Sequence, residues 1–235
     1  TEHARKEIEE MKVSIVIPVY FNQDNLLPLY RDMQEKLFVH TEIEWEIVMV
    51  NDGSQDNSYQ VMQELAKQDS RIRIFSLSRN WGSHAAILCG LSKCTGECAV
   101  VKAADLQEPT QLVLEMVESW KKGNHVVLAV RKDRQESQSQ TLFANLYYWM
   151  VRKAALPQMP KGGFDVYLLD RKVIRVLLLL DEKNSALTGQ ILWSGFTTDS
   201  VYYTRLQREI GKSRWTLKKK FRLVSDTLFS FSTFP

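Results

Sequence analysis

The sequence predicts an α/β fold, with a mostly parallel central sheet covered by helices on both faces. Three observations predict it. Short runs rich in Val and Ile alternate with longer segments whose apolar residues recur at helical spacing. Each run is followed by a cluster of polar turn-forming residues. The length of 235 residues, with 44% hydrophobic and 25% charged residues, fits one large globular domain.

Strands and helices are predicted to alternate over the first part of the chain. The predicted strands are short and β-branched, and they occupy residues 13–20, 45–54, 71–78, 98–105 and 125–132. The predicted helices have apolar residues three and four apart, at residues 24–38, 57–69, 82–96 and 109–123. Right-handed crossovers between parallel strands then place helices on both faces of the sheet.

The pattern changes after about Lys132. Residues 134–140 are polar and predict a loop, and residues 141–155 predict an apolar helix with a basic end. Residues 162–180 predict a turn, a short strand and a helix, and residues 196–209 an edge strand that runs into a basic segment. We find no internal repeat and no low-complexity linker, so we do not divide the chain into two folding domains.

The polar clusters lie where ligands bind in sheets of this kind, beyond the carboxyl ends of the strands. They read "VYFNQDN", "NDGSQDN", "SRNWGS", "KAADLQEP" and "VRKDRQ". No G-x-G-x-x-G motif follows the first strand, which disfavours a dinucleotide-dependent dehydrogenase.

Charge and cysteine usage narrow the function further. The net charge is only +3, but the segment from Arg205 to Pro235 holds eight Lys or Arg against two acidic residues, which favours phosphates or an anionic surface as partners. The three cysteines include no C-x-x-C pair, which argues against a disulfide framework or a structural zinc site and favours a reducing compartment. No apolar run reaches the roughly 18 residues of a membrane span, and the charged start is not a secretory signal.

Six stretches in order carry a resemblance to a known family. They are "SIVIPVYFNQDNL", "EIVMVNDGSQDNS", "LSRNWGSHAAILCGL", "ADLQEP", "GGFDVYLLDRK" and "RLQREIGKSRW". The chain resembles glycosyltransferase family 2 over about residues 12 to 235. Within that family it is most similar to the polyprenyl-phosphate glycosyltransferases, the dolichol-phosphate mannose synthase and bactoprenol glucosyltransferase group.

The resemblance implies a GT-A type fold and a reaction. A hexosyl unit would pass, with inversion, from a nucleotide-diphosphate sugar to a polyprenyl phosphate of the undecaprenyl type, in cell wall or polysaccharide biosynthesis. A UDP-sugar is our guess for the donor. We expect a catalytic domain over residues 1–204, with its acceptor side at about 131–204. Residues 205–235 would form a basic amphipathic juxtamembrane segment, followed by transmembrane helices. The chain itself is then expected to be a soluble part of a protein at the cytoplasmic face of the membrane.

The resemblance also assigns a donor site. Its nucleotide-binding residues are expected to be Pro18, Tyr20, Asn22, Asp52, Asn80, Gly82, Ala104 and Asp105. The carboxylate of Asp52 suits the N–H donors of a nucleotide base, but it could equally cap a helix that starts near residues 56–58. The family often has an acidic residue where Gln23 stands, so a contact that needs that charge is in question.

The stretch "KAADLQEP" raises the question of a metal. The family commonly shows D-A-D-L-Q here, and this chain has Ala103 in place of the first carboxylate while Asp105 and Gln107 remain. Mg²⁺ or Mn²⁺ needs few protein ligands when substrate phosphates and water supply the others, so Asp105 and Gln107 are the expected ligands. A disabled site, or a simple turn at the start of a helix, stays open.

The acceptor phosphate needs positive charge more than it needs a base, because it is already ionised. Guanidinium groups bind phosphate with two hydrogen bonds, and the expected residues are Arg131, Arg134, Arg205, Arg208 and Ser213. We expect these basic segments to be separate from the donor-binding strand ends. Asp165 would orient the acceptor or the sugar, or only cap a turn, and the predicted catalytic group is Asp105, Asp165, Arg131 and Arg134. For any single arginine, a solvated surface position is the alternative.

The tail "WTLKKKFRLVSDTLF" mixes aromatic and basic residues, as amphipathic helices at a membrane interface do. The expected partners are a nucleotide sugar, a polyprenyl phosphate and an anionic membrane surface, without nucleic acid, and a homo-oligomer is compatible with this reading. Two other functions stay open. One is a family 2 transferase with a polysaccharide or protein acceptor. The other is a non-catalytic nucleotide-sugar binding module, for which Ala103 is the reason.

Overall fold

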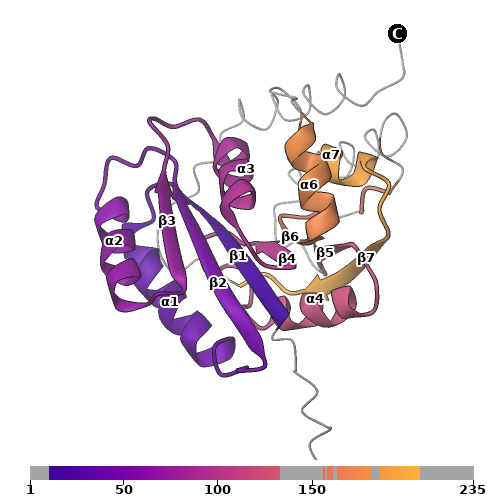
Figure 1. Cartoon of the computed structure of the whole chain (residues 1–235), viewed down its shortest axis with the longest axis horizontal. Coiled ribbons are helices and arrows are strands. Elements are labelled where there is room, and N and C mark those ends of the chain that lie inside the picture. The colour runs from indigo at the N-terminus through magenta and orange to yellow at the C-terminus, as the bar shows by residue number, and fades with distance from the viewer. Residues whose placement is uncertain (1–10, 133–155, 157, 161–162, 181–185, 207–235) are drawn as a thin grey trace, which may run out of the picture.

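The computed structural model describes residues 11–132, 156, 158–160, 163–180 and 186–206. Its centre is one sheet of seven strands in the order β3-β2-β1-β4-β6-β5-β7 (Figure 1). The strands are β1 (Met11–Val19), β2 (Ile43–Asn51), β3 (Ile72–Ser76), β4 (Cys98–Val101), β5 (Val126–Arg131), β6 (Val166–Asp170) and β7 (Thr198–Tyr203). The prediction of a mostly parallel sheet is confirmed.

Six of the strands run in the same direction and β6 runs against them. The pairs β1–β2, β1–β4, β2–β3 and β5–β7 are parallel, whereas β6 pairs antiparallel with both β4 and β5. The start of β6 therefore lies at the same edge of the sheet as the carboxyl ends of the other strands. This edge collects loops from the two halves of the sequence.

Helices cover both faces of the sheet, as predicted. One face carries α1 (Gln23–Lys36), α2 (Ser58–Gln68) and α4 (Leu112–Lys121). The other carries α3 (Ser83–Lys93), α6 (Arg171–Leu179) and α7 (Leu187–Trp193) (Figure 1). The sequence did not lead us to expect α7, a helix of 7 residues. The described residues include no helix long and apolar enough to cross a membrane.

Burial on both faces explains the uninterrupted apolar runs of the central strands. In β1, Ile15 and Ile17 pack in the cluster that contains α1, while Val16 packs in the cluster that contains α3. Pro18 lies inside β1, which continues to Val19. Pro18 has no N–H to continue the ladder toward β4, and the last backbone bond on that side runs from the Lys102 N–H to the Val16 oxygen at 3.0 Å.

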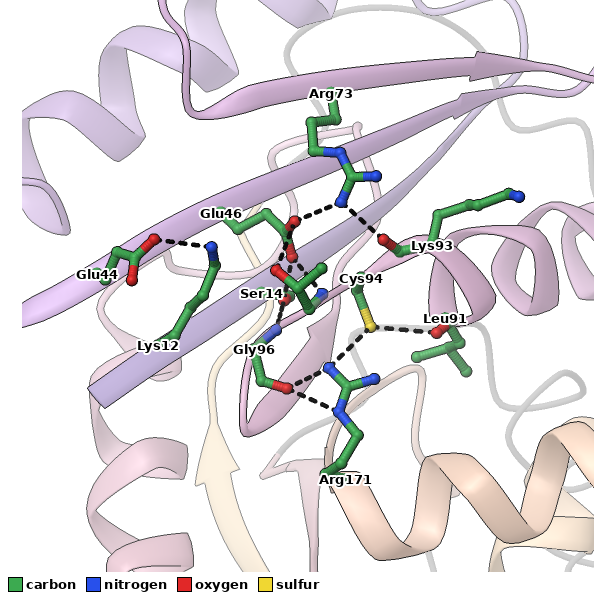
Figure 2. A network of polar contacts seen from close by, with 11 residues as sticks. Lys12, Ser14, Glu44, Glu46, Arg73, Leu91, Lys93, Cys94, Gly96 and Arg171 are labelled. Atoms are coloured by element: carbon green, nitrogen blue, oxygen red, sulfur yellow. Dashed lines mark hydrogen bonds and ion pairs between the residues drawn. The ribbon is translucent and has the colours of Figure 1, made fainter. Parts of the chain in front are cut away.

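A buried carboxylate ties the strands together at the opposite edge of the sheet (Figure 2). Glu46 on β2 accepts hydrogen bonds from the Ser14 hydroxyl at 2.6 Å, the Thr95 amide at 2.7 Å and the Arg73 guanidinium at 2.7 Å. Arg171, the first residue of α6, donates to the carbonyl oxygen of Gly96 from the other side. These bonds join β1, β2, β3 and α6 to the turn before β4, at the edge of the sheet opposite the carboxyl ends of the parallel strands.

The polar loop and apolar helix predicted at 134–140 and 141–155 lie outside the described residues, as does the tail from residue 207 onward.

Candidate functional site at the carboxyl edge of the sheet

Asp52 directly follows β2 and holds the loop before α3. Its two carboxylate oxygens accept the backbone N–H groups of Trp81, at 2.7 Å, and of Gly82, at 2.9 Å. Gly82 is the residue before the first turn of α3, so the carboxylate satisfies free N–H groups at a helix start, where negative charge is favoured. The alternative that Asp52 caps the helix near residues 56–58 is not what these bonds show, because they run to the loop before α3, while the Ser58 N–H at the start of α2 donates to Asp56 Oδ1 at 3.1 Å.

The Asp52 contacts bring two polar clusters together. Gly53 has a φ of 67°, and a Cβ added there would stand 2.5 Å from the carbonyl carbon of Arg79 and the nitrogen of Asn80. Only glycine allows this approach. Asn80 itself is exposed, and the guanidinium of Arg79 stacks on the ring of Trp81 at 3.9 Å from its centroid. The predicted donor residues Asp52, Asn80 and Gly82 therefore lie side by side.

The loop after β1 is fastened to the loop after β2. The N–H of Phe21, which has a φ of 54°, donates to the Ser54 hydroxyl at 3.1 Å. The N–H of Asn22 donates to the Ser58 hydroxyl at 2.9 Å. Asn22 also accepts from the Tyr20 N–H at 3.2 Å. These bonds place Tyr20 and Asn22 beside the residues after β2, as the donor-site prediction requires.

The side chain of Gln23 accepts a hydrogen bond that a carboxylate at this position could also accept. Its side-chain oxygen accepts the N–H of Asn57 at 2.8 Å, just before α2 begins. A neutral carbonyl oxygen is sufficient for this bond. The departure from the acidic residue therefore preserves the link between α1 and α2.

The stretch after β4 forms a loop closed by a buried lysine. The Lys102 ammonium, 1% exposed, donates to the backbone oxygen of Glu108 at 2.7 Å. Burial lowers the pKa of the Lys102 amine, against the attraction of Glu108 and Asp105. Burial and then the Asp105 carboxylate raise the pKa of Glu108 to about 7. Between the two predicted metal ligands, Leu106 adopts a φ of 58°.

Asp105 and Gln107 present oxygen atoms at the same turn. Asp105 Oδ1 lies 3.4 Å from the backbone nitrogen of Gln107, and Gln107 is 9% exposed. The described residues contain no group of three or more His, Cys, Asp or Glu side chains that could hold a metal ion by itself. Ala103 is half-buried beside them and Ala104 is buried at 3% exposure. A cation here would depend on ligands from a bound substrate.

The chain after β7 is bound to this loop. Arg205 Nη2 donates to Gln107 Oε1 at 2.6 Å, and the backbone N–H of Leu206 donates to the backbone oxygen of Gln107 at 2.8 Å. The expectation that Arg205 lies apart from the donor-binding strand ends is therefore wrong. The cause is that β7 runs parallel to β5 and so delivers its following residues to the same edge.

Arg131 and Asp165 meet at the same edge of the sheet. Arg131, the last residue of β5, forms an ion pair with Asp165 Oδ2, which precedes β6. Its Nε also donates to the Tyr203 hydroxyl at 3.4 Å. Burial disfavours the charged form of Arg131, but Asp165 and then Tyr203 outweigh it and raise the pKa of this guanidinium above its usual range.

Sequence reasoning missed three residues of this edge, namely Lys102, Glu108 and Tyr203. Lys102 sits at the end of an otherwise apolar strand, a position where a charged residue is rarely buried without a partner, and that pattern could have found it. Tyr203 had no such signal, because its role depends on the pairing of β7 with β5. The predicted residues Arg134, Arg208 and Ser213 lie outside the described part of the chain.

Known proteins share both the sequence pattern and the fold. The family model described as glycosyl transferase family 2 matches residues 14–179. A putative glycosyltransferase of Bacillus subtilis is 34% identical over 223 residues, covering 95% of this chain and 68% of its own length. A bactoprenol glucosyl transferase of Shigella phage SfX is 33% identical over 226 residues, covering 96% of this chain and 74% of its own.

Solved structures agree on the fold. A mannosyltransferase from Pyrobaculum calidifontis, in complex with GDP-Man and Mn²⁺, aligns with a TM-score of 0.60 at 16% identity, over 86% of this chain and 58% of that one. Glucosyl-3-phosphoglycerate synthase from Mycobacterium tuberculosis aligns with a TM-score of 0.61 at 16% identity, over 96% of this chain and 81% of that one. The predicted GT-A type fold is confirmed, and the chain belongs to glycosyl transferase family 2.

Proposed function

We propose that the chain is a metal-dependent hexosyltransferase that moves a hexosyl unit from a nucleotide-diphosphate sugar, a UDP-sugar in the first instance, to a polyprenyl phosphate, with inversion. The observation that carries the proposal is that the oxygen ligands Asp105 and Gln107 share one edge of the sheet with the guanidinium groups of Arg131 and Arg205. Such an edge suits two phosphate-bearing substrates. The relatives named bactoprenol glucosyl transferase support a polyprenyl acceptor.

The donor side is built by the loops after β1, β2 and β3. Asp52 fixes Gly82 at the start of α3, and the bonds of Asn22 and Phe21 to the loop after β2 fix the other wall. In this proposal the nucleoside lies against these loops, with Pro18 and Tyr20 beside it and its diphosphate directed toward Ala104 and Asp105. The Asp52 carboxylate then either contacts the base directly or shapes the loop that does.

The residues of the β4 loop fit Mg²⁺ or Mn²⁺. Carboxylate and amide oxygens are the ligands that hard cations prefer. Glu108 Oε2 is buried and has no hydrogen-bond partner among the described residues, and Asp105 is close enough to raise the pKa of Glu108. This buried oxygen of Glu108 beside Asp105, unpaired within the described part of the chain, is a group that a bound cation would satisfy. When bound, the ion would neutralise the departing diphosphate, while Asp105 and Gln107 would hold it.

The acceptor needs no strong base, because a lipid phosphate is ionised at neutral pH. Arg131 provides a positive charge at the end of β5, only 15% of its side chain being exposed. Asp165, 55% exposed at its side chain, keeps that guanidinium oriented. We propose that Arg131 holds the acceptor phosphate, with Arg134, Arg208 and Ser213 adding contacts, while Asp165 orients the acceptor or a sugar hydroxyl.

The acceptor also sets the place of the reaction. A polyprenyl chain stays in a bilayer, so the edge that binds its phosphate must face the membrane. The basic residues of the segment 205–235 would then face an anionic leaflet, each contributing on the order of 1 kcal/mol. We propose action at the cytoplasmic face of the membrane, with a homo-oligomer as one arrangement of the full protein.

The test is transfer from labelled UDP-glucose to undecaprenyl phosphate in detergent or vesicles, with Mn²⁺ or Mg²⁺ and with EDTA. Metal-dependent formation of a labelled lipid is expected, and its anomeric configuration, read by NMR, should be opposite to that of the donor. If the label appears in added polysaccharide or protein instead of lipid, the acceptor is that polymer and not a polyprenyl phosphate. Binding of UDP-glucose without transfer or hydrolysis would favour the binding module that Ala103 suggests.

A further inference from the structure

The contact between Arg205 and Gln107 joins two segments that are 98 residues apart in the sequence. The guanidinium donates to the side-chain oxygen of Gln107 at 2.6 Å, a short distance for a bond in which the donor is charged. On the other side of the carboxamide, Gln107 Nε2 faces the backbone oxygen of Leu206 at 3.4 Å. Both contacts have a donor opposite an acceptor, so the orientation of the carboxamide is fixed with its oxygen toward Arg205.

That oxygen is the atom that a divalent cation would use. Nitrogen of a carboxamide is no ligand for Mg²⁺ or Mn²⁺, so Gln107 can serve a metal only through Oε1. A guanidinium and a divalent ion on one neutral oxygen repel each other, because both are cations at short range. Each cation therefore weakens the binding of the other at this oxygen, which favours movement of the guanidinium to another acceptor when a metal binds.

Arg205 is held incompletely in this position. Its Nε is buried and has no hydrogen-bond partner among the described residues, which is costly for a charged donor. The backbone bond from Leu206 N–H to Gln107 O does not involve the Arg205 side chain. The guanidinium can therefore turn away while the main chain stays attached to the loop.

We propose that Arg205 is an internal cation that occupies the Gln107 side-chain oxygen when no metal is bound, and that it leaves this oxygen when the metal and a nucleoside diphosphate bind together. The released guanidinium is then free for a phosphate group at the same edge. This inference rests on the proposed metal-dependent function, and it adds an order: the donor and its metal prepare the phosphate-binding arginine.

The experiment measures Mn²⁺ binding to the nucleotide-free protein, from the EPR signal of free Mn²⁺ at constant ionic strength. Arg205→Met should bind Mn²⁺ more tightly than the parent, by about ten-fold, within the usual range for coupling between two ligands. Lys132→Met is the matched control, since Lys132 is an exposed cation next to Arg131 at the same edge. It removes the same charge without touching Gln107, and its effect should be several-fold smaller.

A double variant shows whether the effect runs through Gln107. Gln107→Leu should weaken Mn²⁺ binding, and adding Arg205→Met to Gln107→Leu should then give no ten-fold gain. Should Arg205→Met fail to fold by circular dichroism, Arg205→Gln makes the same comparison. Equal or weaker Mn²⁺ binding in the folded Arg205 variants would overturn the competition. A different result would overturn the proposed function itself: no Mn²⁺ binding to the parent protein even with UDP present. The proposed competition would then fail as well.

Discussion

The Asp52 carboxylate and the Gly82 backbone nitrogen are 2.9 Å apart, which links the end of β2 to the start of α3. The other carboxylate oxygen accepts the neighbouring N–H of Trp81. Asp52 is 2% exposed, and these N–H groups and the positive end of the helix stabilise its charge. An acidic residue that a motif would assign to the nucleotide base is thus also part of the scaffold.

Asp52→Asn should lower both the free energy of unfolding and the affinity for UDP. A carboxamide has one oxygen, so its NH₂ group would face one of the two N–H donors. A buried group left unpaired costs about 1–3 kcal/mol. Urea unfolding and isothermal titration with UDP check the two effects.

The matched control is Asp24→Asn, at an exposed position in the first turn of α1. It should change neither quantity by more than about 0.5 kcal/mol. If Asp52→Asn unfolds like the parent, its bonds to the α3 loop contribute little. If UDP affinity alone is unchanged, Asp52 is a scaffold residue and not a donor-site residue.

Gly53→Ala should weaken UDP binding, in addition to the loss of stability that a positive φ causes in any residue with a Cβ. Gly53 and Gly123 both have positive φ, of 67° and 98°, but only Gly53 would place a Cβ 2.5 Å from backbone atoms, those of Arg79 and Asn80. Both alanine variants should therefore lose stability from backbone strain. Only Gly53→Ala should also weaken UDP binding, measured by titration. Equal UDP affinity in the two variants would show that the approach of the two loops does not shape the proposed donor site.

The sequence was informative where local pattern and burial agree. The alternation of strands and helices up to Lys132 predicted the layers correctly, because the central strands there are buried on both faces and each helix on one. The antiparallel β6 between β4 and β5 is different. Its place in the sheet depends on pairing between distant segments, about which a single run such as "DVYLLD" carries no information.

The site could be predicted in part for the same reason. Asp52 follows β2 directly and Asp105 lies in the loop that begins after β4, so their position at the carboxyl edge comes with the strands. The sequence predicted that Arg205 lies apart from the loop after β4, because no local pattern links Arg205 to Gln107. Their contact exists because β7 pairs in parallel with β5 and ends beside the β4 loop.

Stability at low pH should depend on Glu46. Burial alone would raise the pKa of this carboxyl, but hydrogen bonds from Ser14, Thr95 and Arg73 outweigh it and hold the pKa below the usual range. The folded protein thus binds the proton less readily than the unfolded chain. The stabilisation is complete above the unfolded pKa of about 4.3, and it is lost as the pH falls below that value through the folded pKa.

Glu46→Gln should accordingly lower the free energy of unfolding at pH 7 and flatten its decline below about pH 5. Urea unfolding at a series of pH values gives both results. Glu64→Gln, at an exposed position on α2, is the control and should keep the slope of the parent. The same slope in Glu46→Gln and the parent would mean that other carboxylates govern acid unfolding.

Arg131→Lys should reduce transfer to lipid phosphate while nucleotide affinity changes little. A lysine cannot contact both Asp165 and Tyr203 as the guanidinium of Arg131 does. Loss of a charged hydrogen bond, about 1.5–3 kcal/mol, corresponds to a drop of roughly ten- to a hundred-fold in kcat/KM for the lipid. The exposed neighbour Lys132, changed to alanine, should turn over normally. Normal turnover in Arg131→Lys would place the acceptor phosphate elsewhere.

The alanine at position 103 should leave metal and nucleotide dependent on each other. With Asp105 and Gln107 as the protein ligands, Mn²⁺ alone should bind weakly, and UDP should strengthen its binding. By linkage, Mn²⁺ must improve UDP affinity by the same factor. Both factors can be measured by titrating each ligand with and without the other.

Ala103→Asp should tighten Mn²⁺ binding in the absence of nucleotide, because it supplies a second carboxylate beside Asp105. Ala103→Asn is the control, since asparagine has the same shape as aspartate without the charge. It should increase the affinity for Mn²⁺ much less than Ala103→Asp does. Activity need not rise in Ala103→Asp, because tighter binding in the ground state does not by itself stabilise the transition state. Asp105→Ala should abolish both the coupling and the transfer. If Asp105→Ala transfers sugar as well as the parent, this loop holds no catalytic metal and serves only as the turn that leads into α4.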